Sequence, residues 1–138
     1  MAYTDIAITA PSSAEEGESV SVSAQVTNTT LSDLLFRVKL YAVEDIYAVP
    51  EPEELIGSFE EVIESGAYKI ISGSFTIPAW DTNILVIVHR FVVYWDYDNS
   101  DSKVVSLKTK AALPTVAKVL GIGALAVLGI ALVAKRKK

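Results

Sequence analysis

Any chemistry in this chain must come from carboxylates, hydroxyls and one histidine, because the sequence contains a single His and no cysteine. The richest run is "DYDNSDS", in which Asp96, Asp98 and Ser100 place oxygen-bearing side chains at alternate positions, as at the start of a calcium loop. The rest of such a loop is missing, because Asp101 and Leu107 stand where an EF-hand has Gly and Glu. The run is also typical of a β-hairpin turn, the interpretation we prefer. The three residues are weak metal candidates, and no metal or other cofactor is predicted.

No catalytic residues are predicted, and we expect a protein that is not an enzyme. His89 lies in a long apolar stretch beside Arg90, which is typical of a packed or edge histidine rather than a general base. The sequence has no glycine-x-Ser-x-glycine elbow, phosphate-binding glycine loop or paired-histidine motif. Glutamates in the turn segments fit a solvated acidic surface: Glu15, Glu16, Glu18, Glu51, Glu53 and Glu54.

Aromatic residues supply a candidate contact patch. Trp95 and Tyr97 lie close together next to Tyr94, and Trp80 belongs to another turn segment. Because Trp and Tyr dominate the energetics of protein interfaces, we predict a contact patch that includes Trp80, Trp95 and Tyr97. The alternative is that at least one of these aromatic side chains packs in the core, as is usual in a small sandwich.

The dominant period in residues 1–109 is two. "SVSVSAQVTN" alternates valines and an alanine with small polar residues, and "FRVKLYA" alternates Phe36, Val38 and Leu40 with polar residues, which predicts strands with one wet face. Further strands are predicted for "DIAITAP", "LIGSFEEV", "KIISGSFTIP" and "KVVSLKT". The apolar run "ILVIVHRFVVYW" (residues 84–95) predicts one buried central strand with a bend near His89.

Turn-rich segments separate these strands, and no helical period is sustained before residue 110. About seven short strands with this spacing predict an all-β domain, an antiparallel immunoglobulin-like β-sandwich. The order "EEGESVSVSAQVTN", "FRVKLYAV", "ESGAYKIISGSFTIP" and "ILVIVHRFVVYWDYDNSDSKVVSL" resembles the cell-adhesion-related (CARDB-type) domains of archaeal and bacterial surface proteins. The resemblance implies the same sandwich and a non-enzymatic spacer, adhesion or assembly role.

The end of the chain predicts one transmembrane α-helix. Val119–Ala134 contains no charged side chain, and a helix of this length spans about 24 Å, to which residues 115–118 add. A helix buried in a soluble core is the alternative. The predicted lipid-facing residues are Val119, Leu120, Ile122, Leu125, Val127, Leu128, Ile130, Leu132 and Val133. The predicted interfacial cations are Lys118, Lys135, Arg136, Lys137 and Lys138.

Charge divides the chain in the same way. Residues 1–102 hold all 17 acidic residues and 4 of the 12 basic ones, so the net charge of −5 averages an acidic head and a basic tail. Such a head would repel phosphate, and sequence-specific nucleic-acid binding is not expected. We predict a sandwich head over residues 1–109, a short basic stalk over 110–118 and a membrane segment with a basic end over 119–138.

Three functions fit this organisation. The first is a structural subunit of a virion with an internal membrane, or of another surface assembly, and the missing secretory signal at the start of this sequence favours it. The second is a cell-envelope adhesion or ligand-binding module, and the third is an enzyme or an enzyme accessory. The expected partners are a lipid bilayer, crossed once by the C-terminal helix, and other structural proteins such as capsid or surface-layer subunits. An oligomeric or assembled state is expected, in a virion membrane or a cell envelope.

Overall fold

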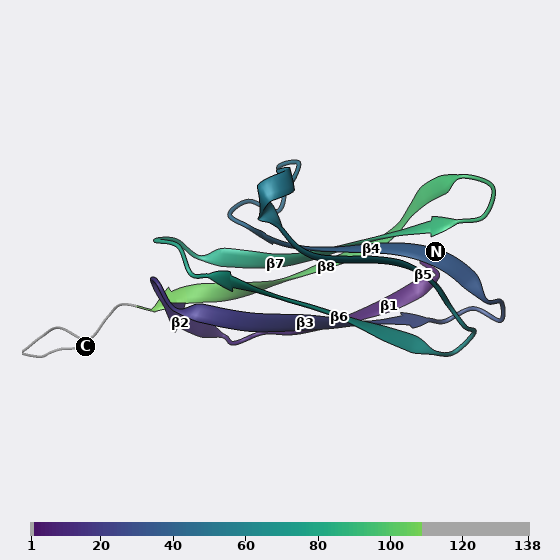
Figure 1. Ribbon diagram of the computed structural model, residues 1–138, viewed down its shortest axis with the longest axis horizontal. Coiled ribbons are helices and arrows are strands. Elements are labelled where there is room, and N and C mark those ends of the chain that lie inside the picture. Colours follow the sequence, from purple (N-terminus) through teal and green to yellow (C-terminus); the bar gives the residue numbers. More distant parts are fainter. Residues whose placement is uncertain (1, 109–138) are drawn as a thin grey trace, which may run out of the picture. The chain divides into compact units, whose positions relative to one another are not determined.

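The computed structural model describes residues 2–108, which form an all-β domain of eight strands and one short 3-10 helix (Figure 1). In chain order the elements are β1 (Thr4–Thr9), β2 (Ser13–Glu15), β3 (Ser19–Asn28), β4 (Leu34–Val43), η1 (Pro52–Glu54), β5 (Leu55–Ile63), β6 (Tyr68–Thr76), β7 (Thr82–Phe91) and β8 (Trp95–Lys108). No helix within residues 2–108 is long and apolar enough to cross a membrane. The predicted membrane helix, its interfacial cations and the basic stalk lie outside the described residues.

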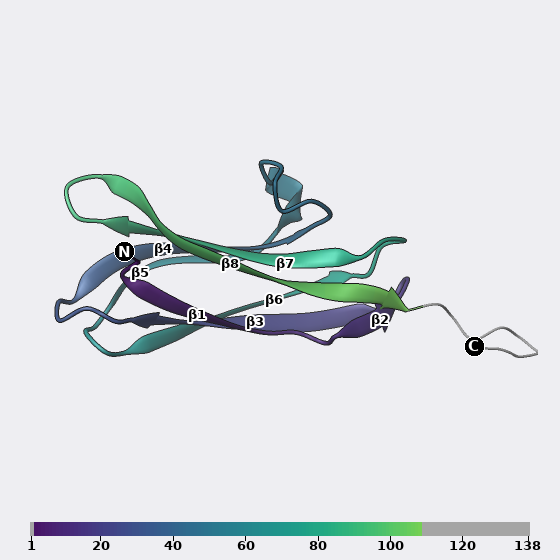
Figure 2. The same ribbon diagram turned by 180° about the vertical axis from the view of Figure 1, so that it is seen from behind.

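The strands form two sheets packed face to face, so the predicted β-sandwich is confirmed (Figure 1). The smaller sheet has the order β1-β3-β6 and is antiparallel throughout. The larger sheet has the order β2-β8-β7-β4-β5, in which only β2 runs parallel to its neighbour, beside the end of β8 (Figure 2). The three-residue strand β2 lies in a segment predicted as a turn, because a strand this short carries no period.

The core lies between the two sheets and is made by the inward residues of each alternating strand. Val20, Val22 and Val26 of β3 belong to one buried cluster with Phe36, Val38 and Leu40 of β4 and with Ile84, Val86 and Val88 of β7. The period-two patterns therefore predicted the inward faces of β3 and β4 correctly. The aromatic side chain in the core is Phe36, and the prediction that one of the patch aromatics is buried is wrong: Trp80, Tyr94, Trp95 and Tyr97 all keep contact with solvent.

The strand predicted over residues 84–95 is in fact a hairpin. β7 ends at Phe91, residues 92–94 form the turn, and β8 begins at Trp95. The predicted turn "DYDNSDS" is therefore part of β8, where Arg90 pairs with Asp96 and His89 with Tyr97 in the ladder. The hairpin end rises away from the two layers (Figure 1), and the apolar residues of its turn are therefore exposed to solvent.

A buried asparagine and a glycine allow the two sheets to pack closely at their edges. Asn28 is fully buried at the end of β3, and its side-chain nitrogen donates to the carbonyl oxygens of Ile63 (2.7 Å) and Ser32 (2.8 Å). Gly73 of β6 lets the backbone of β5 approach, since a Cβ at this position would lie 2.5 Å from the Ile56 carbonyl oxygen. The two sheets therefore meet directly where their edge strands β5 and β6 pass each other.

Candidate functional site

The outer face of the larger sheet is unusually apolar near the hairpin. The register places Val62, Leu35, Phe91 and Trp95 side by side in one row across β5, β4, β7 and β8. Tyr97 follows in the next row, where it is about half exposed at 53%. The outer face of the smaller sheet differs, because β3 turns Ser19, Ser21, Ser23, Gln25 and Thr27 toward solvent.

The turn of the hairpin extends this apolar row. Val92, Val93 and Tyr94 are 60%, 80% and 68% exposed, and the Phe91 and Trp95 rings at the base of the turn pack edge-to-face with centroids 5.2 Å apart. Because row and turn are continuous, we treat them as one feature. We call it the hairpin surface: Leu35, Val62, Phe91, Val92, Val93, Tyr94, Trp95 and Tyr97.

Cationic side chains border the hairpin surface. The Arg37 guanidinium lies 4.1 Å above the centre of the Trp95 ring, while its terminal nitrogen is 3.0 Å from a Glu60 carboxylate oxygen. His89 lies beside Arg37 in the ladder and contacts the Tyr97 ring edge-on, and Lys39 occupies the next outward position of β4. Arg37, whose charge is partnered by Glu60, and Lys39 thus lie at the border of the hairpin surface.

The surroundings of His89 favour its neutral form by lowering its pKa. Partial burial lowers the pKa of the imidazole most, and the positive charges of Arg37 and Lys39 lower it further, against an opposing effect of Asp96. Its neighbours on the sheet are two cations and a tyrosine ring, an arrangement suited to packing and stacking. The prediction that the chain is not an enzyme stays a prediction.

A buried ion pair fastens the base of the hairpin. The Asp98 carboxylate is fully buried and accepts hydrogen bonds from the Thr4 hydroxyl (2.6 Å) and the Tyr3 amide (2.8 Å). It also accepts one from the Arg90 guanidinium (3.1 Å), which stacks 4.4 Å above the Tyr3 ring and contacts Asp96 at 3.3 Å. The hairpin is thereby tied to the start of β1.

The weak metal candidates are not brought together by this arrangement. Asp98 points into the domain, where protein donors occupy its oxygens, whereas the Ser100 hydroxyl shares a hydrogen bond of 2.8 Å with the Tyr97 hydroxyl on the outer face. Asp96 pairs with Arg90. Within residues 2–108 no group of three or more His, Asp or Glu side chains is placed to hold a metal ion.

The predicted contact patch is also divided. Trp95 and Tyr97 belong to the hairpin surface, but Trp80 lies in the loop before β7, at the other end of the ten-residue strand. Ten extended residues separate these ends by about 30 Å. The prediction of a single patch that includes Trp80, Trp95 and Tyr97 is therefore wrong. Strand β7 separates the loop that contains Trp80 from the hairpin that contains the other two residues.

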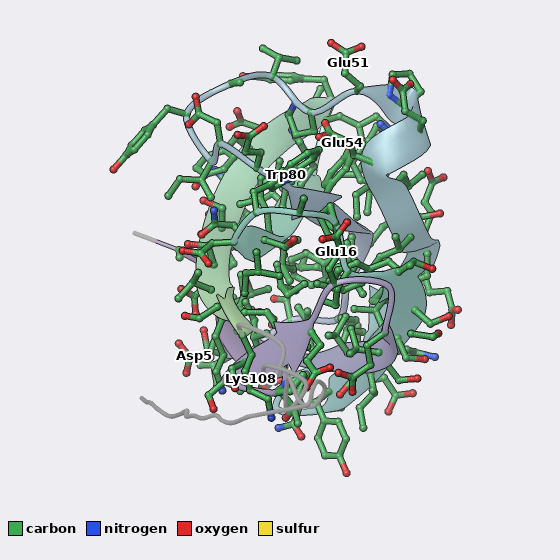
Figure 3. The ribbon with its side chains drawn as sticks, turned by 90° about the vertical axis from the view of Figure 1, so that its left-hand side faces the viewer. Asp5, Glu16, Glu51, Glu54, Trp80 and Lys108 are labelled. Carbon is green, nitrogen blue, oxygen red and sulfur yellow. The ribbon has the colours of Figure 1, made fainter. Side chains whose placement is uncertain are left out.

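Trp80 instead belongs to a groove at its own end of the sandwich. The groove has a volume of about 260 Å³ and opens between η1, the end of β6 and the loop before β7. We call it the Trp80 groove, and it is lined by Ala42, Val43, Glu44, Glu53, Glu54, Ile56, Phe75, Thr76, Pro78, Trp80 and Thr82. Figure 3 views this end of the domain and shows Trp80 between Glu54 and Glu16.

Comparison with known proteins supports the fold. No family model and no curated protein sequence matches the chain. Among solved structures, the crystal structure of a CARDB domain from Pyrococcus furiosus, in complex with di-metal ions, is similar with a TM-score of 0.57 at 13% identity, over 77% of this chain and 90% of that one. The solution structure of that domain gives a TM-score of 0.52 at 16% identity, over 78% of this chain and 97% of that one. The described residues therefore have the immunoglobulin-like CARDB fold, as the resemblance implied.

Sequence reasoning missed two parts of these surfaces. The turn residues Val92 and Val93 were assigned to a buried strand, since hydrophobicity alone does not distinguish a buried run from an exposed tip. Glu44 was not a candidate at all. The apolar run had no alternation whose loss could mark the tip, and no local signal existed for the groove, which four separate segments build.

Proposed function

We propose that this chain is a cell-envelope or adhesion-type module that acts by binding a partner protein on the hairpin surface, without catalysis. One observation carries the proposal: eight neighbouring apolar side chains lie on the outer face of the larger sheet and on the turn of its hairpin, and all of them except the partly covered Leu35 and Trp95 are exposed. Large exposed apolar patches on small domains mark sites of interaction, and aromatic residues dominate such interfaces.

The border of the hairpin surface indicates the chemistry of the partner. Arg37 and Lys39 lie next to it, and Lys39 takes no part in the ion pairs formed within residues 2–108. A partner with an apolar centre and a carboxylate on its rim would complement both features. The same pattern disfavours contact between two identical hairpin surfaces, because that would bring like charges together.

The hairpin surface lies far from the end of the domain that continues to the proposed membrane anchor, so a partner could reach it. It lies at the start of β8, and Lys108, through which the chain continues, lies at the end of this 14-residue strand, about 40 Å away. We propose that Val119–Ala134 anchors the chain in a bilayer, with Lys118 and the basic C-terminal residues at its two interfaces. Replacing both Leu125 and Leu128 with Asp should move the chain from the membrane to the soluble fraction; retention in the membrane would contradict the anchor.

Matched substitutions on the two outer faces test the binding proposal. Val93→Asp is compared with Ile70→Asp, since Ile70 is an exposed apolar residue (60%) on the smaller sheet. Both variants and their reference also carry Leu125→Asp and Leu128→Asp, so that the proposed anchor does not retain the chain by itself. We expect Val93→Asp to weaken retention on envelope preparations of the source organism about tenfold or more, and Ile70→Asp to leave it unchanged. Equal effects of the two substitutions, or no effect of Val93→Asp, would overturn the proposal.

Protease protection distinguishes this function from a virion subunit. Digestion of the head in intact cells, with the fragment identified by mass, is the outcome expected of an envelope module. Protection in cells, together with a stoichiometric band in purified particles, would instead support the virion role and contradict display on the cell.

A further inference from the structure

We propose that the Trp80 groove binds the side chain of a lysine or arginine from a basic segment of a second partner. The groove and the hairpin surface lie at opposite ends of β7, so this site is independent of the function proposed above. It is a binding site for a cationic, long-stemmed side chain rather than for a free ion.

The floor of the groove is apolar and suited to an aliphatic stem. Val43 is buried (3%), and Ile56, Phe75 and Pro78 are partly covered beside it. These four side chains come from β4, β5, β6 and the loop after β6, so the floor is part of the packed sandwich. Lysine and arginine bury their methylene groups along such surfaces while the charged group stays at the rim.

The rim supplies attraction for a positive charge. Glu44, Glu53 and Glu54 line the groove, and the lining contains no lysine or arginine. The ion pairs within residues 2–108 join Arg37, Lys69 and Arg90 to other acids, and none of them involves a groove carboxylate. A cationic ligand would therefore meet negative charge that those described pairs leave uncompensated.

One rim carboxylate is held in a defined position, and an indole ring also lines the groove. One Glu54 carboxylate oxygen accepts a hydrogen bond of 2.7 Å from the Glu51 amide at the start of η1, which orients the carboxylate and leaves its second oxygen for a ligand. Trp80 follows the loop after Pro78 and keeps 48% of its surface exposed. An indole face next to carboxylates attracts ammonium and guanidinium groups by cation–π interaction.

Other ligand classes fit less well. A bound divalent ion needs several converging oxygens, and no such group of His, Asp or Glu side chains exists within residues 2–108. A neutral sugar could stack on Trp80, but it would gain little from three uncompensated carboxylates. The size of the groove, about 260 Å³, also exceeds what a single ion fills.

Tryptophan fluorescence of the full-length protein tests the proposal. The chain has two tryptophans, so Trp95→Phe leaves Trp80 as the reporter. Titration with tetralysine should change the Trp80 emission saturably, and the affinity should fall as salt is added, while tetra(acetyl-lysine) and a neutral oligosaccharide should produce no change. Saturation by acetylated peptide or by the oligosaccharide would overturn the assignment of a cationic ligand.

Neutralising the groove glutamates distinguishes binding in the groove from attraction by the acidic surface as a whole. Combined Glu44→Gln and Glu53→Gln should weaken tetralysine binding about five- to tenfold. Glu44→Gln alone is also compared with Glu16→Gln, because each removes one charge and Glu16 is exposed at the same end of the domain but does not line the groove (Figure 3). A loss as large with Glu16→Gln as with Glu44→Gln would mean attraction by the acidic surface as a whole and would refute the site.

Discussion

The two ends of the sandwich present opposite chemistry although the same strands run between them. The hairpin end exposes valines and aromatic rings bordered by Arg37 and Lys39. The other end has the Trp80 groove, whose rim carries three glutamates. An average over the whole chain, a net charge of −5, describes neither end. A domain of this size can therefore carry two surfaces that attract different partners.

The two ends also differ in how they are held. The base of the hairpin is held by the buried Asp98 carboxylate, which accepts hydrogen bonds from three protein groups. The turn of the hairpin lies beyond these hydrogen bonds. The groove is formed by loops and a single helical turn at the ends of strands, and its lining residue Ile56 lies where β5 and β6 approach each other at Gly73. Variants can therefore damage one end while leaving the other intact, which gives the following predictions.

Asp98→Ala should have the largest effect on stability. It leaves the Arg90 guanidinium, the Tyr3 amide and the Thr4 hydroxyl without their buried acceptor, and we expect a loss of about 3–5 kcal/mol. The measurement is the free energy of unfolding in urea. Asp101→Ala, on the same strand but exposed, should stay within about 0.5 kcal/mol of the wild type. Similar losses for both variants would contradict the role given to the buried pair.

Gly73→Ala should destabilise the domain by about 1–3 kcal/mol, because its Cβ would lie 2.5 Å from the Ile56 carbonyl oxygen. Ile56 also lines the groove, so the tetralysine affinity should fall while retention through the hairpin surface is kept. Ser74→Ala, an exposed neighbour on β6, is the control for both measurements. Wild-type stability in Gly73→Ala would show that β5 can move away without cost.

Arg37→Ala should cost about 0.5–1 kcal/mol, since the arginine stacks on Trp95 and pairs with the exposed Glu60. In a Trp80→Phe background, the emission of Trp95 should change with this substitution. Lys69→Ala removes a different exposed pair, with Glu61, and should leave the emission of Trp95 unaltered. An unchanged Trp95 spectrum in Arg37→Ala would show that the stacking is absent in solution.

The smallest effect should be a pH dependence from His89. Its folded-state pKa lies below the ordinary value of 6.5, so between the two values the unfolded chain binds more protons. Stability should therefore be full above about pH 6.5 and decrease as the pH falls toward the folded-state pKa, by less than about 0.5 kcal/mol because solvent screens this site. The decrease attributable to His89 should vanish in His89→Gln. A steeper loss of stability at low pH in His89→Gln than in the wild type would contradict the predicted direction.

The sandwich was predictable because burial imposes a period of two on each strand. Val20, Val22 and Val26 could be assigned to the core from spacing alone, and the structure buries all three. The hairpin was not predictable in this way. Val92 and Val93 are as apolar as core residues, and only their position beyond the covered part of the sheet makes them a turn.

The candidate sites show the same division. Trp95 and Tyr97 were assigned to one surface from their closeness in the sequence, and they do share it, because they point to the same side of one strand. Trp80 was grouped with them wrongly, and its actual neighbours Glu44 and Glu54 come from segments more than 20 residues away in sequence. No local pattern relates residues that meet only when strand ends come together.

What the sequence determined by itself was the alternation that builds each strand, the acidic charge of the head and the apolar run near the C-terminus, since these depend on the order of residue types alone. The tertiary structure decided where the hairpin turns, which carboxylate is buried with Arg90, and which side chains share the groove. These features depend on strand register and on the contact between two sheets. Register and sheet contact are set by interactions between residues distant in sequence, so they exist only in the folded domain.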